Sequence, residues 1–214
     1  GVGYSDKPED NYTIKKFSKD IKVILDQENI KKTNLLGLSY GGVVVQEFYN
    51  MYPESVEKIA LISTVFSGRN AIWKAQKEFK KITKPLSNNA SQKEIDEKYK
   101  LNLELIFPKE YLEKNQAKIE EFIHHSVGAN RKETLKTQKK RIKALIEYTN
   151  TNLENIKVPV LVMHGNSDRY VPVENVQFFF KIPDIRVVIT RNTGHYIPLE
   201  RKKEFVKEVK KHML

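Results

Sequence analysis

One stretch, residues 34–51, constrains the fold more than any other part of this sequence. Its apolar run 34–38 has the length of a buried strand and passes through a glycine-rich turn directly into an apolar helix, 43–51. Pro53 ends that helix, and a second buried apolar run follows at 58–63. Short apolar runs that alternate with helices are typical of a parallel sheet covered on both faces.

The same alternation returns near the C-terminus, whereas residues 67–150 show only helical patterns. We therefore predict an α/β fold, with a mostly parallel sheet flanked by helices and an all-helical segment inserted after the second strand. The predicted division is a first core part at 1–66, the helical insertion at 67–150, and a second core part at 151–214. Further strands are expected at residues 158–163 and 186–189, and helices at 11–25, 172–180 and 198–214.

Composition excludes several classes of chemistry. The 214 residues include no cysteine, which removes disulfides, a thiolate nucleophile and Cys-ligated zinc or iron–sulfur centres. No apolar run approaches the ~20 residues of a transmembrane helix. No metal-binding motif and no dinucleotide fingerprint is present. We therefore expect no metal, no cofactor and no membrane span.

The net charge of +11 is unevenly distributed. Residues 67–150 hold 19 basic and 11 acidic side chains, and residues 201–214 hold 6 and 2. Glutamates are interspersed among these lysines, and no aromatic residues alternate with them in the manner of a stacking surface for bases. We therefore interpret the excess as a solvated helical surface and do not expect nucleic acid as a partner.

The turn inside the opening stretch carries the first chemical signal. Residues 37–41 read GLSYG, which fits G-x-S-x-G between a strand and a helix. A sharp turn of this kind presents Ser39 in a strained conformation above the sheet, and we expect glycines 37 and 41 to leave room for the neighbouring chain. The backbone N–H of Tyr40, at the helix N-terminus, is the predicted oxyanion donor. The alternative is a glycine-rich turn with a helix-capping serine.

A serine nucleophile needs a base, and the chain offers the histidines 124, 125, 164, 195 and 212. His195 lies between the last strand and the last helix, at the carboxyl edge of the predicted sheet, where Ser39 also lies. We predict His195 as the base. The other four are interpreted as structural, helix-surface or terminal residues.

The base in turn needs a carboxylate that fixes its tautomer. Asp168 follows the strand at 158–163 and reaches the same sheet edge, whereas Asp184 precedes a strand and should lie at the opposite edge. The predicted order Ser39, Asp168, His195 is that of the α/β-hydrolase triad.

Several motifs together resemble the α/β-hydrolase superfamily, in its small-lid esterase, lactonase and C–C hydrolase branch. The matching motifs are residues 1–8 (GVGYSDKP), 36–42 (LGLSYGG), 52–56 (YPESV), 162–168 (VMHGNSD) and 194–200 (GHYIPLE). The resemblance implies that residues 67–150 form the lid. It also implies roughly 60–70 residues before the first motif, by typical element lengths, including a second oxyanion donor.

The sequence begins after that region. We expect an N-terminal segment to be missing from it; the alternative is a damaged or split hydrolase. A chain starting at Gly1 would form a four-stranded sheet, with the edge of its first strand and one apolar face uncovered.

The predicted function is hydrolysis of a carboxylic ester, lactone or related acyl bond in a small apolar substrate, through an acyl-enzyme. Acyl transfer to another acceptor, as in an acyltransferase or perhydrolase, and ligand reception on a hydrolase scaffold are the alternatives. We expect a cytoplasmic monomer or homodimer whose partner is the small-molecule substrate. The predicted substrate-binding residues are Phe66, Trp73, Phe107 and Tyr111, and further candidates for the apolar walls are Phe79, Ile106 and Phe122.

Overall fold

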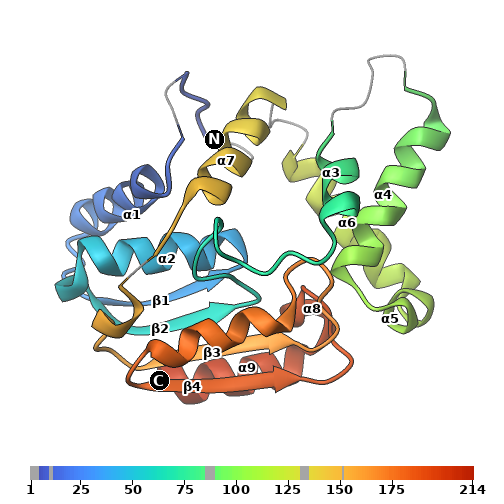
Figure 1. The fold of residues 1–214 in the computed structure, drawn as a ribbon. Helices are drawn as coiled ribbons and strands as arrows, with labels where there is room; N and C mark the ends of the chain where they lie inside the picture. Colours follow the sequence, from blue (N-terminus) through green and yellow to red (C-terminus); the bar gives the residue numbers. More distant parts are fainter. Residues whose placement is uncertain (1–4, 10–11, 85–89, 131–134, 151) are drawn as a thin grey trace.

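Four parallel strands form one sheet in the computed structural model of the protein. The structure describes residues 5–9, 12–84, 90–130, 135–150 and 152–214, so half of the predicted first motif, residues 1–4, lies outside it. The strand order is β1-β2-β3-β4, with each strand beside its neighbour in the sequence (Figure 1). The strands are β1 (Thr33–Leu38), β2 (Val56–Ile62), β3 (Val160–Gly165) and β4 (Ile185–Thr190).

Helices occupy the connections. Short 3₁₀ helices η1 (Pro53–Ser55), η2 (Leu153–Asn155) and η3 (Val173–Lys181) lie among them. The α-helices are α1 (Ile14–Gln27), α2 (Tyr40–Met51), α3 (Gln76–Thr83), α4 (Gln92–Ile106), α5 (Lys109–Lys114), α6 (Gln116–Asn130), α7 (Leu135–Glu147), α8 (Ile197–Glu200) and α9 (Lys202–Met213).

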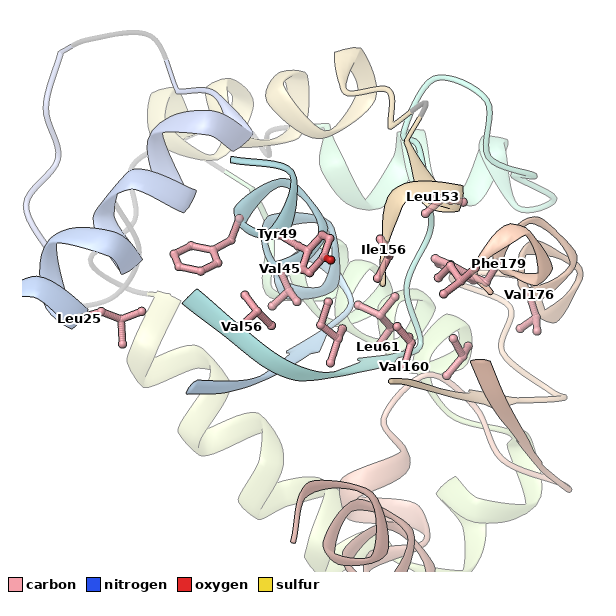
Figure 2. Packing of buried hydrophobic residues seen from close by; sticks show 14 residues of the cluster. Leu25, Val45, Tyr49, Val56, Leu61, Leu153, Ile156, Val160, Val176 and Phe179 are labelled. Carbon is pink, nitrogen blue, oxygen red and sulfur yellow. The ribbon is translucent and has the colours of Figure 1, made fainter. Parts of the chain in front are cut away.

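Successive residues of the central strands face opposite sides of the sheet, as the period of two in a strand requires. Ile59 and Leu61 of β2 belong to the core cluster beneath α2 (Figure 2), with Val45 and Phe48 of that helix. Ala60 and Ile62 of β2 belong to a second cluster, which α9 covers with Phe205, Val209 and Met213. Both faces of the central strands are therefore buried, in three layers.

The first strand lies at an edge of the sheet. Among the described residues, β1 pairs only with β2, and its Leu36 is 42% exposed. Uncovered apolar surface on this sheet is thus confined to its margins, whereas the expectation from sequence was a whole uncovered face. The helix α9 accounts for the difference, because its apolar side chains pack on the face of β2 and β3 that is turned away from α2.

Two predicted helices differ in detail from the structure. The segment predicted at 172–180 is the 3₁₀ helix η3, and the helix predicted at 198–214 is divided at Arg201. Arg201 has non-helical backbone angles, φ −130° and ψ 45°. Its guanidinium donates to the Thr193 hydroxyl and to the Arg191 carbonyl, at 3.0 and 2.9 Å. These bonds hold the chain at the break between α8 and α9.

The described residues between 67 and 150 contain α3 to α7 and no strand beyond a single isolated bridge. Helices α3 to α6 gather on the side of the sheet to which the strand arrows point (Figure 1). The two ends of this region meet in that antiparallel bridge between Ser67 and Thr149. The Ser67 hydroxyl and the Gly68 N–H also donate to the Tyr148 carbonyl, at 3.1 and 2.9 Å. The chain therefore leaves and re-enters the α/β core at one point.

None of the helices in the described ranges has both the length and the apolar character needed to cross a membrane.

Candidate active site

Ser39 occupies the turn between β1 and α2, and its backbone is strained. Its φ of 51° and ψ of −117° lie in a region that favours glycine, at a typical cost of about 1–3 kcal/mol. The surroundings hold this conformation from both sides. The Ser39 N–H donates to the Ile62 carbonyl at 2.8 Å, and the Thr64 hydroxyl donates to the Ser39 carbonyl at 2.6 Å. The turn therefore fixes the position of the Ser39 backbone, from which the side chain projects.

The glycines of this turn allow close packing, but the pair that does so is not the predicted pair, 37 and 41. A Cβ at Gly37 would lie 2.5 Å from the backbone of Gly41, so a side chain there would push the strand from the helix. Gly41 itself has open space around its Cβ position. Gly42 is the crowded residue instead, because a Cβ there would lie 2.6 Å from the Thr64 side chain. Space for the turn thus comes from glycines 37 and 42.

The loops after β3 and β4 bring Asp168 and His195 together. The His195 Nδ1 lies 2.7 Å from Asp168 Oδ2, and both side chains are almost fully buried. The second carboxylate oxygen, Oδ1, accepts the backbone N–H groups of Tyr170 and Val171 at 2.9 and 2.7 Å. With Nδ1 bound to the carboxylate, Nε2 of His195 is the nitrogen left to accept a proton.

Opposing effects set the charge of Asp168. Burial alone would raise the pKa of this carboxyl, but His195 and His164 beside it hold the pKa below its ordinary value. The His164 Nε2 lies 3.4 Å from Asp168 Oδ2 and 2.8 Å from the Val171 carbonyl oxygen. His164, interpreted from the sequence as structural, thus braces the loop that carries Asp168.

Backbone contacts hold the histidine loop against the end of α4. The His195 N–H donates to the Ile106 carbonyl at 2.7 Å. A Cβ at Gly194 would lie 2.1 Å from that same oxygen, so glycine is required for the approach. Gly194 thus makes room for the segment that arrives from the helical region.

Glu200 was not identified from the sequence and is central to this loop. Its carboxylate accepts the N–H groups of Gly194 and Tyr196, the two residues that flank His195, at 2.8 and 3.2 Å. Burial raises the pKa of Glu200 to about 7, against the lowering effect of these two N–H donors. Its position in the last motif, GHYIPLE, five residues after His195, was the signal available.

Tyr170 lies between the loop that carries Asp168 and the ring of His195. Its ring lies 5.0 Å, centroid to centroid, from the His195 ring. It also lines a cavity of about 380 Å³ onto which Ser39 opens. In the described part of the chain no hydrogen bond joins the Ser39 hydroxyl to His195. Such bonds often form only when substrate is bound.

Tyr40 begins α2, so its N–H is among the first N–H groups of a helix, which have no acceptor within the helix. Its phenol donates to the Arg141 carbonyl at 3.3 Å, and the Arg141 guanidinium lies 5.4 Å from the centre of its ring. Helix α7 is thereby attached directly above the serine turn.

Only one of the four predicted substrate-binding residues, Trp73, lines the Ser39 cavity. The structure places the other three elsewhere, which corrects the expectation that they line it. Phe66 follows β2 and lies against Phe178, with ring centroids 4.5 Å apart, beside the main core cluster. Phe107 is buried and stacks on Tyr111 at 5.5 Å beneath the histidine loop. Apolar periodicity could not distinguish a cavity wall from this supporting packing.

Searched over the described ranges, the chain shows no group of three or more His, Cys, Asp or Glu side chains arranged to hold a metal ion.

The raised pKa of Glu200 predicts a pH dependence of stability. Its pKa in the folded protein, about 7, lies above the ordinary value of 4.5, so the unfolded chain loses this proton first as pH rises. Stability from this group is therefore full below pH 4.5 and is lost as pH rises through 7. We expect the free energy of unfolding of the wild type, minus that of Glu200→Gln, to fall between pH 5 and 7.5 in urea titrations. The exposed Glu204→Gln is the control, and parallel pH profiles for wild type and Glu200→Gln would contradict the assignment.

The comparisons with known proteins identify the fold and the family. The family model described as alpha/beta hydrolase fold matches residues 1–202. The 2-hydroxy-6-oxo-2,4-heptadienoate hydrolase of Pseudomonas putida is 20% identical over 219 residues, covering 98% of this chain and 74% of that protein. An esterase structure from Rhodococcus sp. has a TM-score of 0.81 at 21% identity, covering 99% of this chain and 76% of its own.

A further esterase structure, from Exiguobacterium antarcticum, has a TM-score of 0.78 at 24% identity and covers all of this chain and 78% of its own. At these identities the solved structures establish the fold, and the family match spans nearly the whole chain. The protein therefore belongs to the family of enzymes with the α/β-hydrolase fold.

Proposed function

We propose that the protein is a serine hydrolase with Ser39 as nucleophile, His195 as general base and Asp168 as the orienting carboxylate. The observation that carries this proposal is the 2.7 Å pair of His195 and Asp168, on loops at the sheet edge where Ser39 also stands. A buried histidine bound through Nδ1 to a carboxylate is poised to act as a base through Nε2. The strained serine backbone supports the same role.

The chemistry follows from these positions. Nε2 of His195 takes the Ser39 proton as the hydroxyl oxygen attacks the substrate carbonyl, and the N–H of Tyr40 stabilises the oxyanion. His195 then gives the proton to the leaving alcohol, which leaves an acyl group on Ser39. A water molecule, deprotonated by His195, attacks this acyl-enzyme and releases the acid with the serine restored. Asp168 keeps the imidazole in the required tautomer throughout.

The substrate proposed is a carboxylic ester, lactone or related acyl compound of modest size. The cavity beside Ser39, about 380 Å³, lies within the range of small-molecule sites, ~300–1,000 Å³. Its walls come mainly from residues 67–150, including Trp73, Phe79 and Leu145, so we assign that region the role of a lid. The names of the relatives, esterases and a dienoate hydrolase, support the same class of carbonyl substrate.

A fluorophosphonate tests this proposal directly, because it reacts with a serine that an adjacent base activates. We expect the intact mass of the protein to increase by one adduct, and the Ser39→Ala variant to gain none. Ser167→Ala, which removes an exposed hydroxyl in the acid loop, is the matched control and should be labelled like the wild type. An adduct that persists in Ser39→Ala would contradict the assignment of the nucleophile.

A further inference from the structure

A second cavity, of about 420 Å³, lies next to the one at Ser39. None of the three proposed catalytic residues lines it, nor does Tyr40, and its volume also falls within the range of ligand sites, ~300–1,000 Å³. Five side chains line both cavities and therefore form the partition between them: Trp73, Phe79, Ile142, Leu145 and Tyr170. The partition consists of side chains, from α3, α7 and the loops before α3 and after β3.

Aromatic rings connect this partition to the catalytic base. The ring centroids of Trp73 and Phe79 lie 6.2 Å apart, and those of Phe79 and Tyr170 lie 5.5 Å apart. Tyr170 in turn contacts the ring of His195. The Trp73 Nε1–H donates to the Gly68 carbonyl at 3.0 Å, which holds the indole in the partition. All five partition residues are only partly buried, so a rotamer change of one of them can join the two cavities.

The second cavity is apolar inside and charged at its mouth. Leu105, only 1% exposed, lies at its inner end, and Leu145 and Ile142 continue its wall. Its charged lining residues, Arg69, Lys80 and Glu147, are exposed and so surround the opening. Ile146 lines it while 49% exposed, which leaves an apolar side chain in contact with water. A concave apolar surface of this kind gains free energy when a hydrocarbon group displaces that water.

We propose that the second cavity receives the unbranched hydrocarbon arm of the ester, with Trp73 as the residue that sets how far the arm extends. The proposal rests on the serine hydrolase function proposed above. Short esters fill only the cavity at Ser39. Longer ones cross the partition and bury their chain against Leu105 and Leu145, so affinity and turnover rise with chain length until the second cavity is full.

The first test compares turnover across two ester series, p-nitrophenyl esters from acetate to decanoate and n-alkyl acetates, which place the chain on the acyl or the alcohol side. Of these two cavities, Ala75 and Ile146 line the second and not the one at Ser39. We expect Ala75→Phe and Ile146→Trp each to lower kcat/KM for the long esters of one series by about tenfold or more, and to leave the acetate within twofold. Trp73→Ala should raise the ratio of kcat/KM for the long esters to kcat/KM for the acetate. Lys77→Phe, exposed on α3 and outside both cavities, is the control.

The second test needs no turnover. Trp73 is the only tryptophan among the 214 residues, so its fluorescence reports on the partition itself. We expect sodium decanoate, below its critical micelle concentration, to shift the tryptophan emission of the Ser39→Ala variant. The double variant Ser39→Ala, Ala75→Phe should show no such shift. Trp73→Phe supplies the background signal.

The two failures are distinguishable. Short esters turned over without chain-length dependence in either series, and with no fluorescence response, would overturn the cavity proposal alone. A response to decanoate that Ala75→Phe abolishes, in a protein that turns over no ester, would uphold the cavity and overturn the serine hydrolase function.

Discussion

Replacing Ser39 by alanine is expected to lower kcat for p-nitrophenyl acetate by about 10⁴–10⁶-fold, because the attacking oxygen is removed and only binding and oxyanion stabilisation remain. The fold should persist. The two bonds that hold the turn involve the Ser39 backbone N–H and carbonyl, which alanine retains. Steady-state kinetics and circular dichroism on the same preparations measure both effects.

Ser167→Ala again provides the matched control, and it should keep wild-type kinetics because its hydroxyl bonds only to Asn166 in the same loop. A kcat of Ser39→Ala within about tenfold of the wild-type value would sink the proposed role of this serine.

The second large effect is expected from Asp168→Asn, which should lower kcat by about 10⁴-fold. Its amide can offer N–H to His195 Nδ1, which then becomes an acceptor and leaves the proton on Nε2, the wrong nitrogen for a base. The backbone N–H groups of Tyr170 and Val171 still find an acceptor in the amide oxygen, so the loop should hold its shape. The loss should therefore appear mainly in kcat, with KM changed little.

The matched control for this substitution is Asp184→Asn. Asp184 is exposed, immediately before β4, and therefore stands at the edge of the sheet opposite the loops of Asp168 and His195. Equal losses in Asp168→Asn and Asp184→Asn would show that charge removal in general, and not the bond to His195, lowers the rate.

Local patterns predicted the parts of this molecule that depend on short segments. The four strands lie within about two residues of their predicted positions because each is a compact apolar run with polar ends. Strands that all point the same way bring their following loops to one edge, and this alone placed Asp168 and His195 near each other. The strained angles of Ser39 likewise follow from a strand that must turn directly into a helix.

Features that depend on distant segments could not be predicted in this way. Glu200 acts through backbone N–H groups in a bent loop, and a helical pattern does not reveal which way its first turn faces. Phe66 and Phe107 have the apolar character of a cavity wall, yet each packs against neighbours that only the tertiary structure supplies. The second cavity arises where α3 meets α7, which are separated by more than fifty residues of sequence.

The point where Ser67 and Thr149 meet has a consequence for how such a protein can change. Hydrogen bonds join the two ends of the helical region. The distance between the points where the chain leaves and re-enters the core is therefore the same whatever the length of the chain between them. The entropy of closing such a loop grows slowly, by only about 0.6 kcal/mol for each doubling of its length. Helices there that do not contact the loops of Ser39, Asp168 and His195 can therefore be lengthened or exchanged while the sheet keeps its position, so the choice of substrate can diverge without rebuilding the proposed chemistry.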